Sequence, residues 1–371
     1  MSMKKFILMA AVLTVSVVAS AKVWRINYDE NVNADFRTIT AACADANVAE
    51  GDTLYCEPGG HQGATSDNII SRNGLKIFGP GWGYEPNYGS TSTMAAASFK
   101  SAIQIKASNV KLSGLVATEI NILAVTEKCL KDITIDRCKC KEIGTTTKPF
   151  RDTIRNLTIN GCYITTKIRL SNMVYLKDAY IQNNIIYYTS STSVNCIELT
   201  RYESTDIVDN INILRNTIWA KHSGELVYAN NSLIQDNIII NNDQTYGTKK
   251  VLSGSGNTIH DNVLSLDSSL ADNAKIVANY PNNIYGATEA SVFTCESRTE
   301  YGIEEYFLLK DDSPAKNAAH DDTDCGAFSG STPYVIGSRP QGIPYLHDVN
   351  VPEQAVGNTL TVTFKVANQN E

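Results

Sequence analysis

Short apolar runs, each interrupted by a polar pair, recur along the middle of the chain. In residues 232–242, SLIQDNIIINN, three isoleucines follow Asp236 and Asn237, which are residue types that strands disfavour. The same order of residues, written apolar, x, x, Asn, x, apolar, also occurs elsewhere. The copies with Asn begin at Ile181, Ile213, Ile234 and Ile259. A polar pair that returns in the same place predicts a repeated structural unit.

The copies lie one short repeat apart. Two earlier copies, from Ile135 and Ile159, carry Cys138 and Cys162 in place of Asn, and a looser copy begins at Leu112. From each first residue to the next, the steps are 23, 24, 22, 32, 21 and 25 residues. Each unit is rich in Ile, Val, Thr, Tyr and Asn, without helical periodicity, and holds about three short strands. This pattern predicts a solenoid of strands, and a β-sandwich with chance similarity is the alternative.

A parallel β-helix fits the repeat, because each turn stacks on the one before at the usual strand spacing of about 4.8 Å. Stacking places the Asn residues in one buried column, where each side-chain amide can donate to the Asn one turn away. We expect Asn237 to form the bend between two strands, since Asn tolerates left-handed backbone. Cys138 and Cys162 would continue the column as small buried groups, in positions where a disulfide would be strained.

The segments at both ends of the repeat resemble a known family. Residues 35–63, DFRTITAACADANVAEGDTLYCEPGGHQG, are similar to the opening of secreted β-helix proteins of the Bacteroidetes type, in the pectate-lyase-like superfamily. LKIFGPGWGYEPN (75–87) looks like their next strand and turn, and LLKDDSPAKNAAHDDTDCGAF (308–328) looks like their closing segment. The resemblance covers about residues 22–330 and implies an all-β fold, a right-handed single-stranded parallel β-helix. It says little about activity, because the superfamily mixes lyases, hydrolases, esterases and non-enzymes.

We expect four parts along the chain. They are a signal peptide (1–21), an N-terminal cap with the first coil (22–74), the β-helix coils (75–328), and a linker or wrapped tail with a short C-terminal β strand (329–371). In the cap, Asn33 or Asp35 can begin a helix that covers the open end of the β-helix. The final TLTVTFKVA alternates like a strand, which would pair back on the helix, cover its far end or serve for attachment.

The N-terminus has the order of a secretory signal. Lys4 and Lys5 precede an apolar run from residue 6 to residue 18, and Ala19-Ser20-Ala21 follows. The run is shorter than the roughly 20 residues that a spanning helix needs, so we expect no membrane span. The sequence predicts cleavage after Ala21 and a secreted, periplasmic or cell-surface location.

The net charge and the cysteine content limit the kinds of ligand and metal that we expect the protein to bind. The net charge is −7 and the pI is about 5.4, without the basic stripe of a nucleic-acid surface. A polyanionic ligand would therefore need a local basic patch. The nine cysteines lack a zinc spacing, and we expect no metal or other cofactor. Asp321, Asp322 and Asp324 offer a calcium site, although a solvated loop is the interpretation we favour. We expect a monomer.

Alternation places a column of outward charges beside a loop. The step of 32 residues contains about ten extra residues between 198 and 210, and functional residues favour such loops. Alternation predicts that Leu226 and Tyr228 point inward, and the outward residues on successive coils then form one column: Arg169, Glu198, Glu225, Lys250 and Lys275. Further residues lie at its edges: Arg201, Lys221 and His222.

These charges predict an acidic-polysaccharide site. The cations would neutralise a uronate carboxylate, and Lys250 or Arg169 would abstract the C5 proton in a β-elimination. Alternatively, Glu198 and Glu225 would act as acid and nucleophile in glycoside hydrolysis. A surface ion ladder without chemistry is the third interpretation. The motifs of the superfamily's lyases and hydrolases are absent. A non-catalytic, adhesin-like protein that binds glycan or protein is therefore the alternative to an enzyme, for which a lyase ranks ahead of a hydrolase.

Overall fold

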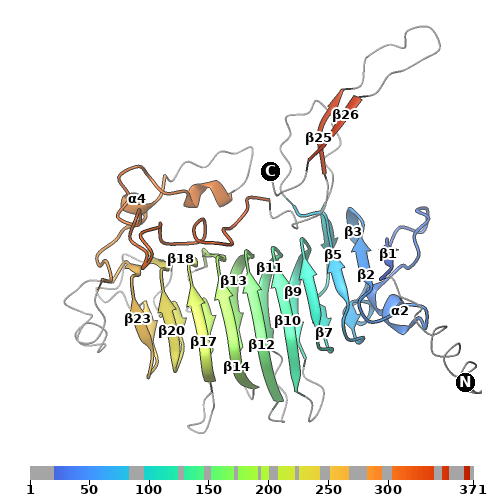
Figure 1. Cartoon of the computed structure of the whole chain (residues 1–371), viewed down its shortest axis with the longest axis horizontal. Helices are drawn as coiled ribbons and strands as arrows, with labels where there is room; N and C mark the ends of the chain where they lie inside the picture. Colours follow the sequence, from blue (N-terminus) through green and yellow to red (C-terminus); the bar gives the residue numbers. More distant parts are fainter. Residues whose placement is uncertain are drawn as a thin grey trace, which may run out of the picture.

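The chain folds into a parallel β-helix, as the repeat predicted (Figure 1). The computed structural model describes residues 21–82, 96–123, 129–145, 152–170, 174–190, 194–199, 208–221, 225–242, 251–266, 282–294, 303–337, 345–350 and 363–367. Within these residues, every paired strand of the coils is parallel to its neighbours, and the coils stack in chain order. The outer surface of the solenoid has three faces, which we call A, B and C.

Face A is a ten-stranded sheet with one strand from each coil and β1 at its N-terminal edge. Its strands, in spatial order, are β1 (Val23–Ile26), β2 (Thr53–Cys56), β5 (Lys76–Phe78), β8 (Val110–Ser113), β10 (Leu130–Asp136), β12 (Asp152–Asn160), β14 (Val174–Gln182), β17 (Val208–Leu214), β20 (Ser232–Gln235) and β23 (Thr258–His260). The strands of the middle coils are the longest, so this face is broadest at its centre.

Faces B and C belong to one fourteen-stranded sheet that bends, because three long strands serve both faces. These shared strands are β9 (Val116–Ile122), β11 (Lys139–Thr145) and β13 (Tyr163–Arg169). Their first halves pair on face B with β3 (Gly59–His61), β6 (Ala97–Phe99), β15 (Ile185–Tyr188), β18 (Thr217–Ala220), β21 (Ile238–Asn241) and β24 (Val263–Leu264). Their second halves pair on face C with β4 (Ile69–Ile70), β7 (Ile103–Ile105), β16 (Ile197–Glu198), β19 (Val227–Tyr228) and β22 (Leu252–Ser253).

The first residues of the seven sequence copies form one buried row inside the solenoid. In register they run Leu112, Ile135, Ile159, Ile181, Ile213, Ile234 and Ile259. Each is at most 5% exposed, and all belong to one apolar core. Alternation along each strand supplies the row, because every second side chain points to the same side of a sheet. The sequence repeat is therefore the repeat of the core.

The predicted Asn column is confirmed at the corner between faces A and B. Each Nδ2 donates to the Oδ1 of the Asn one coil further, from Asn184 to Asn216 (2.9 Å), Asn216 to Asn237 (3.0 Å) and Asn237 to Asn262 (3.0 Å). These four residues are fully buried. The column continues to Asn283, which accepts from Asn262 at 3.0 Å and which the sequence pattern did not include.

The prediction that the Asn itself makes the left-handed bend was wrong by one residue. Left-handed backbone occurs at the preceding position, for example Arg215 (φ 52°), Asp236 (φ 59°) and Asp261 (φ 57°). The two residues have separate roles: the first turns the chain, and the second points inward, where the neighbouring coils satisfy the hydrogen bonds of its amide. Cys138 and Cys162 continue the column as buried free thiols, as predicted.

A short helix precedes the first coil, and its start differs from the prediction. Helix α2 spans Ile39–Ala44, and Thr38 caps it by accepting from Ala41 N at 3.0 Å, in place of Asn33 or Asp35. Asp35 instead accepts from Arg25 N (2.7 Å), which fixes it beside β1. Ile39, Ala42 and Cys43 are buried in the core. Closure of the solenoid end by this helix stays a prediction.

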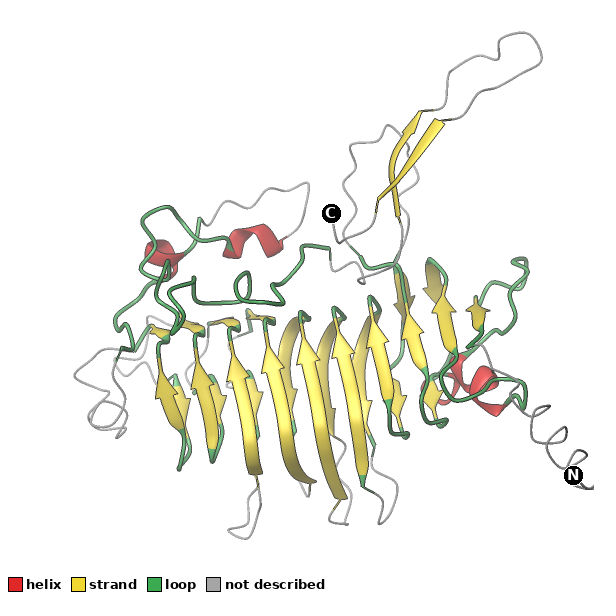
Figure 2. Ribbon diagram, viewed as in Figure 1, coloured by secondary structure: helices red, strands yellow, loops and turns green. Residues whose placement is uncertain are grey.

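After the last coil, the chain turns back and lies along face B. Sequence analysis extended the coils to residue 328, but the last paired coil strand in the described chain is β24. Helix α4 (Glu289–Val292), the 3₁₀ turn η3 (Ile303–Phe307) and the following loop run across the coils (Figures 1 and 2). We call residues 303–337 the clasp. Apolar side chains of the clasp and of α4 cover the outward side chains of face B: Tyr163, Ile185, Trp219, Ile238, Ile240 and Val263.

The C-terminal β tail is a separate two-stranded hairpin. Strand β25 (Tyr345–Asn350) pairs antiparallel with β26 (Thr363–Ala367), and in the described residues neither pairs with the solenoid. The hairpin projects away from the coils (Figure 2). The described part of the tail therefore pairs locally, rather than back on the β-helix.

Candidate functional site

Among the described residues of the predicted charge column, two are neighbours on face C. Arg169 pairs in register with Glu198 on the next coil. Beyond Glu198 the row continues to Tyr228 and then to Ser253. Glu225 is three positions before Tyr228, so it is not the in-register neighbour of Glu198.

The alternation used for that prediction fails at β19. Leu226 and Val227 are both fully buried, whereas Tyr228 is partly exposed in the row of Glu198. Strand β19 has two residues and follows a corner, and side chains alternate only along an extended strand. The prediction that Tyr228 points inward was therefore wrong, and the predicted Glu198–Glu225 pair is not supported.

The structure describes one further predicted site residue, Lys221. Lys221 is exposed and follows β18, at the corner between faces B and C. The remaining four lie outside the described residues: Arg201, His222, Lys250 and Lys275.

The charges that do meet on face C pair with one another. Glu142 Oε1 lies 3.2 Å from Arg169 Nη2, and Glu142 Oε2 lies 3.9 Å from Lys167 Nζ. Glu119 lies beside Glu142 in register. Arg169 Nε is buried without a hydrogen-bond partner in the described part of the chain. With Glu198, three carboxylates face two cations here, so the described residues in this part of face C carry no excess of positive charge.

Face A carries a row of cations that sequence analysis did not single out. Lys131, Arg155 and Lys177 lie in register on three consecutive coils. Lys131 and Arg155 are exposed, and Lys177 is partly exposed, 3.4 Å from Asp209 at the end of the row.

The residue after each cation has left-handed backbone: Asp132 (φ 58°), Asn156 (φ 53°) and Asp178 (φ 54°). Asn156 Nδ2 donates to Asp132 Oδ1, and Asn210 Nδ2 donates to Asp178 Oδ1, both at 2.7 Å. This second Asx ladder fixes the backbone beside the cations. It also places a carboxylate next to Lys131 and Lys177, which leaves Arg155, beside Asn156, as the cation with an uncharged neighbour.

A row of hydroxyl groups lies next to the cations on the same face. Thr134, Thr158 and Tyr180 are in register, and Tyr180 is 40% exposed. The preceding coils continue this row with Lys111 and Lys76. The side chains come from a second repeat that the sequence displays: LKDITID at 130–136, IRNLTIN at 154–160 and LKDAYIQ at 176–182. Comparing these three segments position by position would have found both rows.

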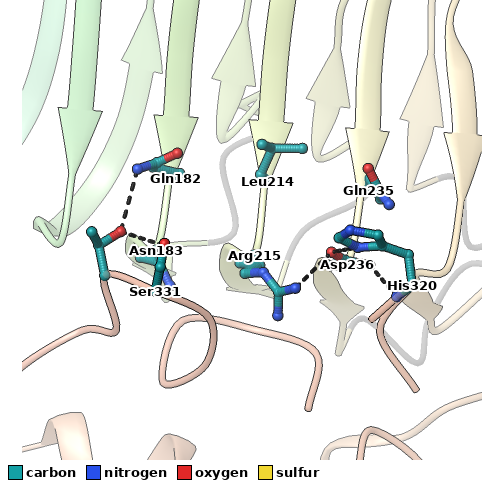
Figure 3. Close-up of a pocket in the computed structure, with 9 residues that line it drawn as sticks. Gln182, Asn183, Leu214, Arg215, Gln235, Asp236, His320 and Ser331 are labelled. Atoms are coloured by element: carbon teal, nitrogen blue, oxygen red, sulfur yellow. Dashed lines mark hydrogen bonds and ion pairs between the residues drawn. The ribbon is translucent and has the colours of Figure 1, made fainter. Parts of the chain in front are cut away.

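A polar pocket lies at the corner where face A meets the clasp (Figure 3). Its volume is about 130 Å³. One wall consists of the ends of β14, β17 and β20 with the residues that follow them, and the clasp supplies the other wall. The lining residues are Gln182, Asn183, Leu214, Arg215, Gln235, Asp236, His320, Ser331 and Thr332.

The charged groups of the pocket are paired among themselves. Asp236, which is 1% exposed, accepts from His320 N (3.0 Å) and His320 Nδ1 (2.7 Å), and its Oδ2 lies 3.2 Å from Arg215 Nη2. Arg215 also binds Asp321 at 2.8 Å. The Thr323 hydroxyl and the Arg215 guanidinium hold the pKa of the Asp321 carboxyl below its ordinary value.

The acidic run of the clasp does not gather around a cation. Asp321 binds Arg215, and Asp324 Oδ1 accepts from Asn317 N at 3.0 Å. In the residues that the structure covers, no three His, Cys, Asp or Glu side chains are arranged to hold a metal ion. The calcium prediction for Asp321, Asp322 and Asp324 therefore gains no support from these contacts.

Neither the described helices nor the comparisons with known proteins show which family the chain belongs to. Among the described helices, none is both long and apolar enough to cross a bilayer. No model of a known protein family matches the chain, and no curated protein matches it either. The resemblance to the pectate-lyase-like superfamily therefore stays a prediction that rests on the quoted segments.

Proposed function

We propose that the protein is exported and binds an acidic polysaccharide along face A. The observation that carries this proposal is the in-register row of Lys131, Arg155 and Lys177 beside the hydroxyl row of Thr134, Thr158 and Tyr180. A polymer laid along the coils would meet the same kinds of group at each strand spacing of about 4.8 Å. The signal-like sequence of residues 1–21 supports export.

The side-chain chemistry suits a sugar polymer with acidic groups. Arg155 presents a planar fork of donors that matches a carboxylate or sulfate, and hydroxyl side chains can donate to and accept from sugar hydroxyls. The exposed ring of Tyr180 offers an apolar surface with a polar end, on which a sugar ring can stack. Because the whole chain has a net charge of −7, such a site depends on local cations and should weaken as salt screens them.

Binding without cleavage is the form of the function that we propose. Glu225 is not in register with Glu198, and the predicted base Lys250 lies outside the described residues. Arg169, the other predicted base, is ion-paired to Glu142. The proposal therefore keeps the acidic polysaccharide as ligand and moves its binding site from face C to face A.

Calorimetric titration with polygalacturonate, alginate and hyaluronan, and with the neutral polymer dextran, tests this. We expect at least one acidic polymer to bind and dextran to bind more weakly. Arg155→Ala should weaken acidic binding about tenfold or more, the usual effect of losing a charge-assisted hydrogen bond. Arg169→Ala on face C is the matched control, with circular dichroism to show that both variants are folded.

Three results would contradict the proposal. If the protein bound none of the acidic polymers, the proposed function would be wrong. If it bound dextran as tightly as the acidic polymers, the proposed role of the cations would be wrong. A larger loss in Arg169→Ala than in Arg155→Ala would return the site to face C. Release of an unsaturated product that absorbs in the ultraviolet would show that the protein is a lyase and would contradict binding without cleavage.

A further inference from the structure

We infer that the corner pocket between face A and the clasp is a binding subsite for a neutral sugar unit, in which Gln235 and His320 bind hydroxyl groups. The inference rests on the proposed function in one respect, because the same polysaccharide would supply the sugar. The pocket adjoins face A directly: Gln182 and Gln235 belong to the outward row next to that of Tyr180.

The first argument is an unpartnered amide. Gln235 is 8% exposed and lines the pocket, yet in the part of the chain that the structure describes its carboxamide has no hydrogen-bond partner (Figure 3). The amide atoms of Gln235 are not among the fully buried atoms that lack a partner, so they face the open space of the pocket, and polar groups that do not bond to protein bond to what fills that space. The amide is therefore expected to meet a molecule that occupies the pocket, either water or a ligand.

The second argument concerns His320. Its Nδ1 contacts the buried carboxylate of Asp236 at 2.7 Å, and a carboxylate only accepts, so the proton of a neutral ring is on Nδ1. Nε2 is then left as an acceptor, with no partner among the described residues. The His320 side chain is 50% exposed, while that of Asp236 is 2% exposed. A buried acid thus fixes the orientation of an accessible ring, which preorganises Nε2 for a donor such as a hydroxyl.

The third argument is the charge of the pocket. Arg215 is bound to Asp236 and Asp321, and Asp236 is also bound to His320, so each charge has an opposite or hydrogen-bonded partner within the protein. An added carboxylate would meet Asp236 without a free cation. Groups that both donate and accept, as hydroxyls do, match the amide of Gln235, the Nε2 of His320 and the hydroxyl of Ser331. Leu214 adds an apolar patch for the C–H face of a ring.

The size agrees with part of one sugar. A volume of about 130 Å³ is close to that of a cavity of about 150 Å³ that holds one benzene ring. That is enough for the hydroxyls and hydroxymethyl group on one side of a pyranose, whose other side would remain outside. The pocket is therefore a subsite for one unit of a chain that lies on face A, and not an enclosed cavity for a whole oligosaccharide.

Saturation-transfer NMR with single sugars tests the inference. The probes are the methyl glycosides of glucose, galactose, mannose, rhamnose and fucose, together with glucuronate and galacturonate. We expect at least one neutral glycoside to receive saturation and the uronates to receive less. Gln235→Met keeps the length of the side chain and removes its hydrogen bonds, so it should weaken that binding about tenfold. Thr258→Ala, on the neighbouring strand of face A and outside the pocket, should leave it unchanged.

A second variant separates binding from folding. His320→Asn keeps a donor for Asp236 at the position of Nδ1 and removes Nε2, so it should retain the clasp and lose sugar binding. Absence of any signal from the neutral glycosides would overturn the inference and leave a pocket for water only. Preference for uronates, or unchanged binding in Gln235→Met, would overturn it as well.

The proposed function and the proposed subsite can each be refuted without the other. Arg155→Ala should weaken binding of the acidic polymer and leave the glycoside signal unchanged. Gln235→Met should reduce the glycoside signal and leave the salt-sensitive part of polymer binding unchanged. Loss of glycoside binding in both variants would contradict a separate subsite.

Discussion

Replacing Asn237 by Leu is expected to lower the free energy of unfolding by about 3 kcal/mol. Asn237 is fully buried within the Asn column. Its Oδ1 accepts from Asn216 N (2.8 Å) and Asn216 Nδ2 (3.0 Å). Its Nδ2 donates to Ile213 O (2.8 Å), Gln235 O (2.9 Å) and Asn262 Oδ1 (3.0 Å). One side chain therefore joins three coils.

The magnitude follows from the groups that lose a partner. Leu leaves the buried N–H of Asn216 unsatisfied, at a cost of about 1–3 kcal/mol. The other lost bonds add about 1 kcal/mol net, since Asn216 Nδ2 still donates to Ile181 O and Asn262 Oδ1 still accepts from the backbone N–H of residue 237. The greater apolar area of Leu does not offset this, because the surrounding groups are polar.

Urea denaturation followed by far-ultraviolet circular dichroism measures the change. Asn212→Leu is the matched control, because Asn212 points outward on face A and is only partly buried; it should change stability by about 0.5 kcal/mol or less. A loss in Asn237→Leu no larger than that of the control would refute the role of the column. Loss of ligand binding with unchanged stability would refute the assignment of Asn237 to the fold.

Two further predictions concern thiols and tight corners. Of the eight described cysteines, Cys129 is exposed and seven are buried, and burial raises the pKa of buried thiols such as Cys138, to about 12. The ninth cysteine, Cys295, lies outside the described residues, so the experiment uses the variant Cys295→Ser. At pH 8, Cys129 should then be the one thiol that reacts rapidly with Ellman's reagent in the native state. Rapid labelling of a second cysteine in peptide mapping would contradict the burial. Gly254→Ala should cost about 3 kcal/mol, because φ is +106° and a Cβ would lie 1.7 Å from Ala229 O. Gly51→Ala, with φ +94° and open space around it, should cost about 1 kcal/mol in the same urea experiment, and equal losses at both sites would argue against the close contact.

The sequence was sufficient to predict the solenoid because the core repeats. The first residues of the copies, from Leu112 to Ile259, recur about once per coil, and together they form one in-register row. The Asn column could be predicted for the same reason, since stacked identical side chains must satisfy one another. The residue that bends the chain could not be located as well, because Arg215, Asp236 and Asp261 have no common side-chain chemistry for that backbone.

The candidate sites were harder to predict, because they depend on short strands and distant segments. Strands β16, β19 and β22 have two residues each, too few for alternation to define a face, so Glu225 was predicted in the place beside Glu198 that Tyr228 occupies. The pocket joins Asp236 to His320, which is 84 residues away. No periodic signal connects these two positions, since the clasp crosses the coils instead of repeating with them.

The clasp has a consequence for the order in which the chain matures. In a solenoid each coil contacts only its neighbours, so early coils can form while later ones are still being synthesised. Here, Asn183, Arg215 and Asp236 on three successive coils all bind residues between 320 and 329. Face B consequently keeps its apolar side chains uncovered until residues 303–337 have been made. The clasp therefore covers this apolar surface, which is at risk of aggregation, only after all the coils have been made.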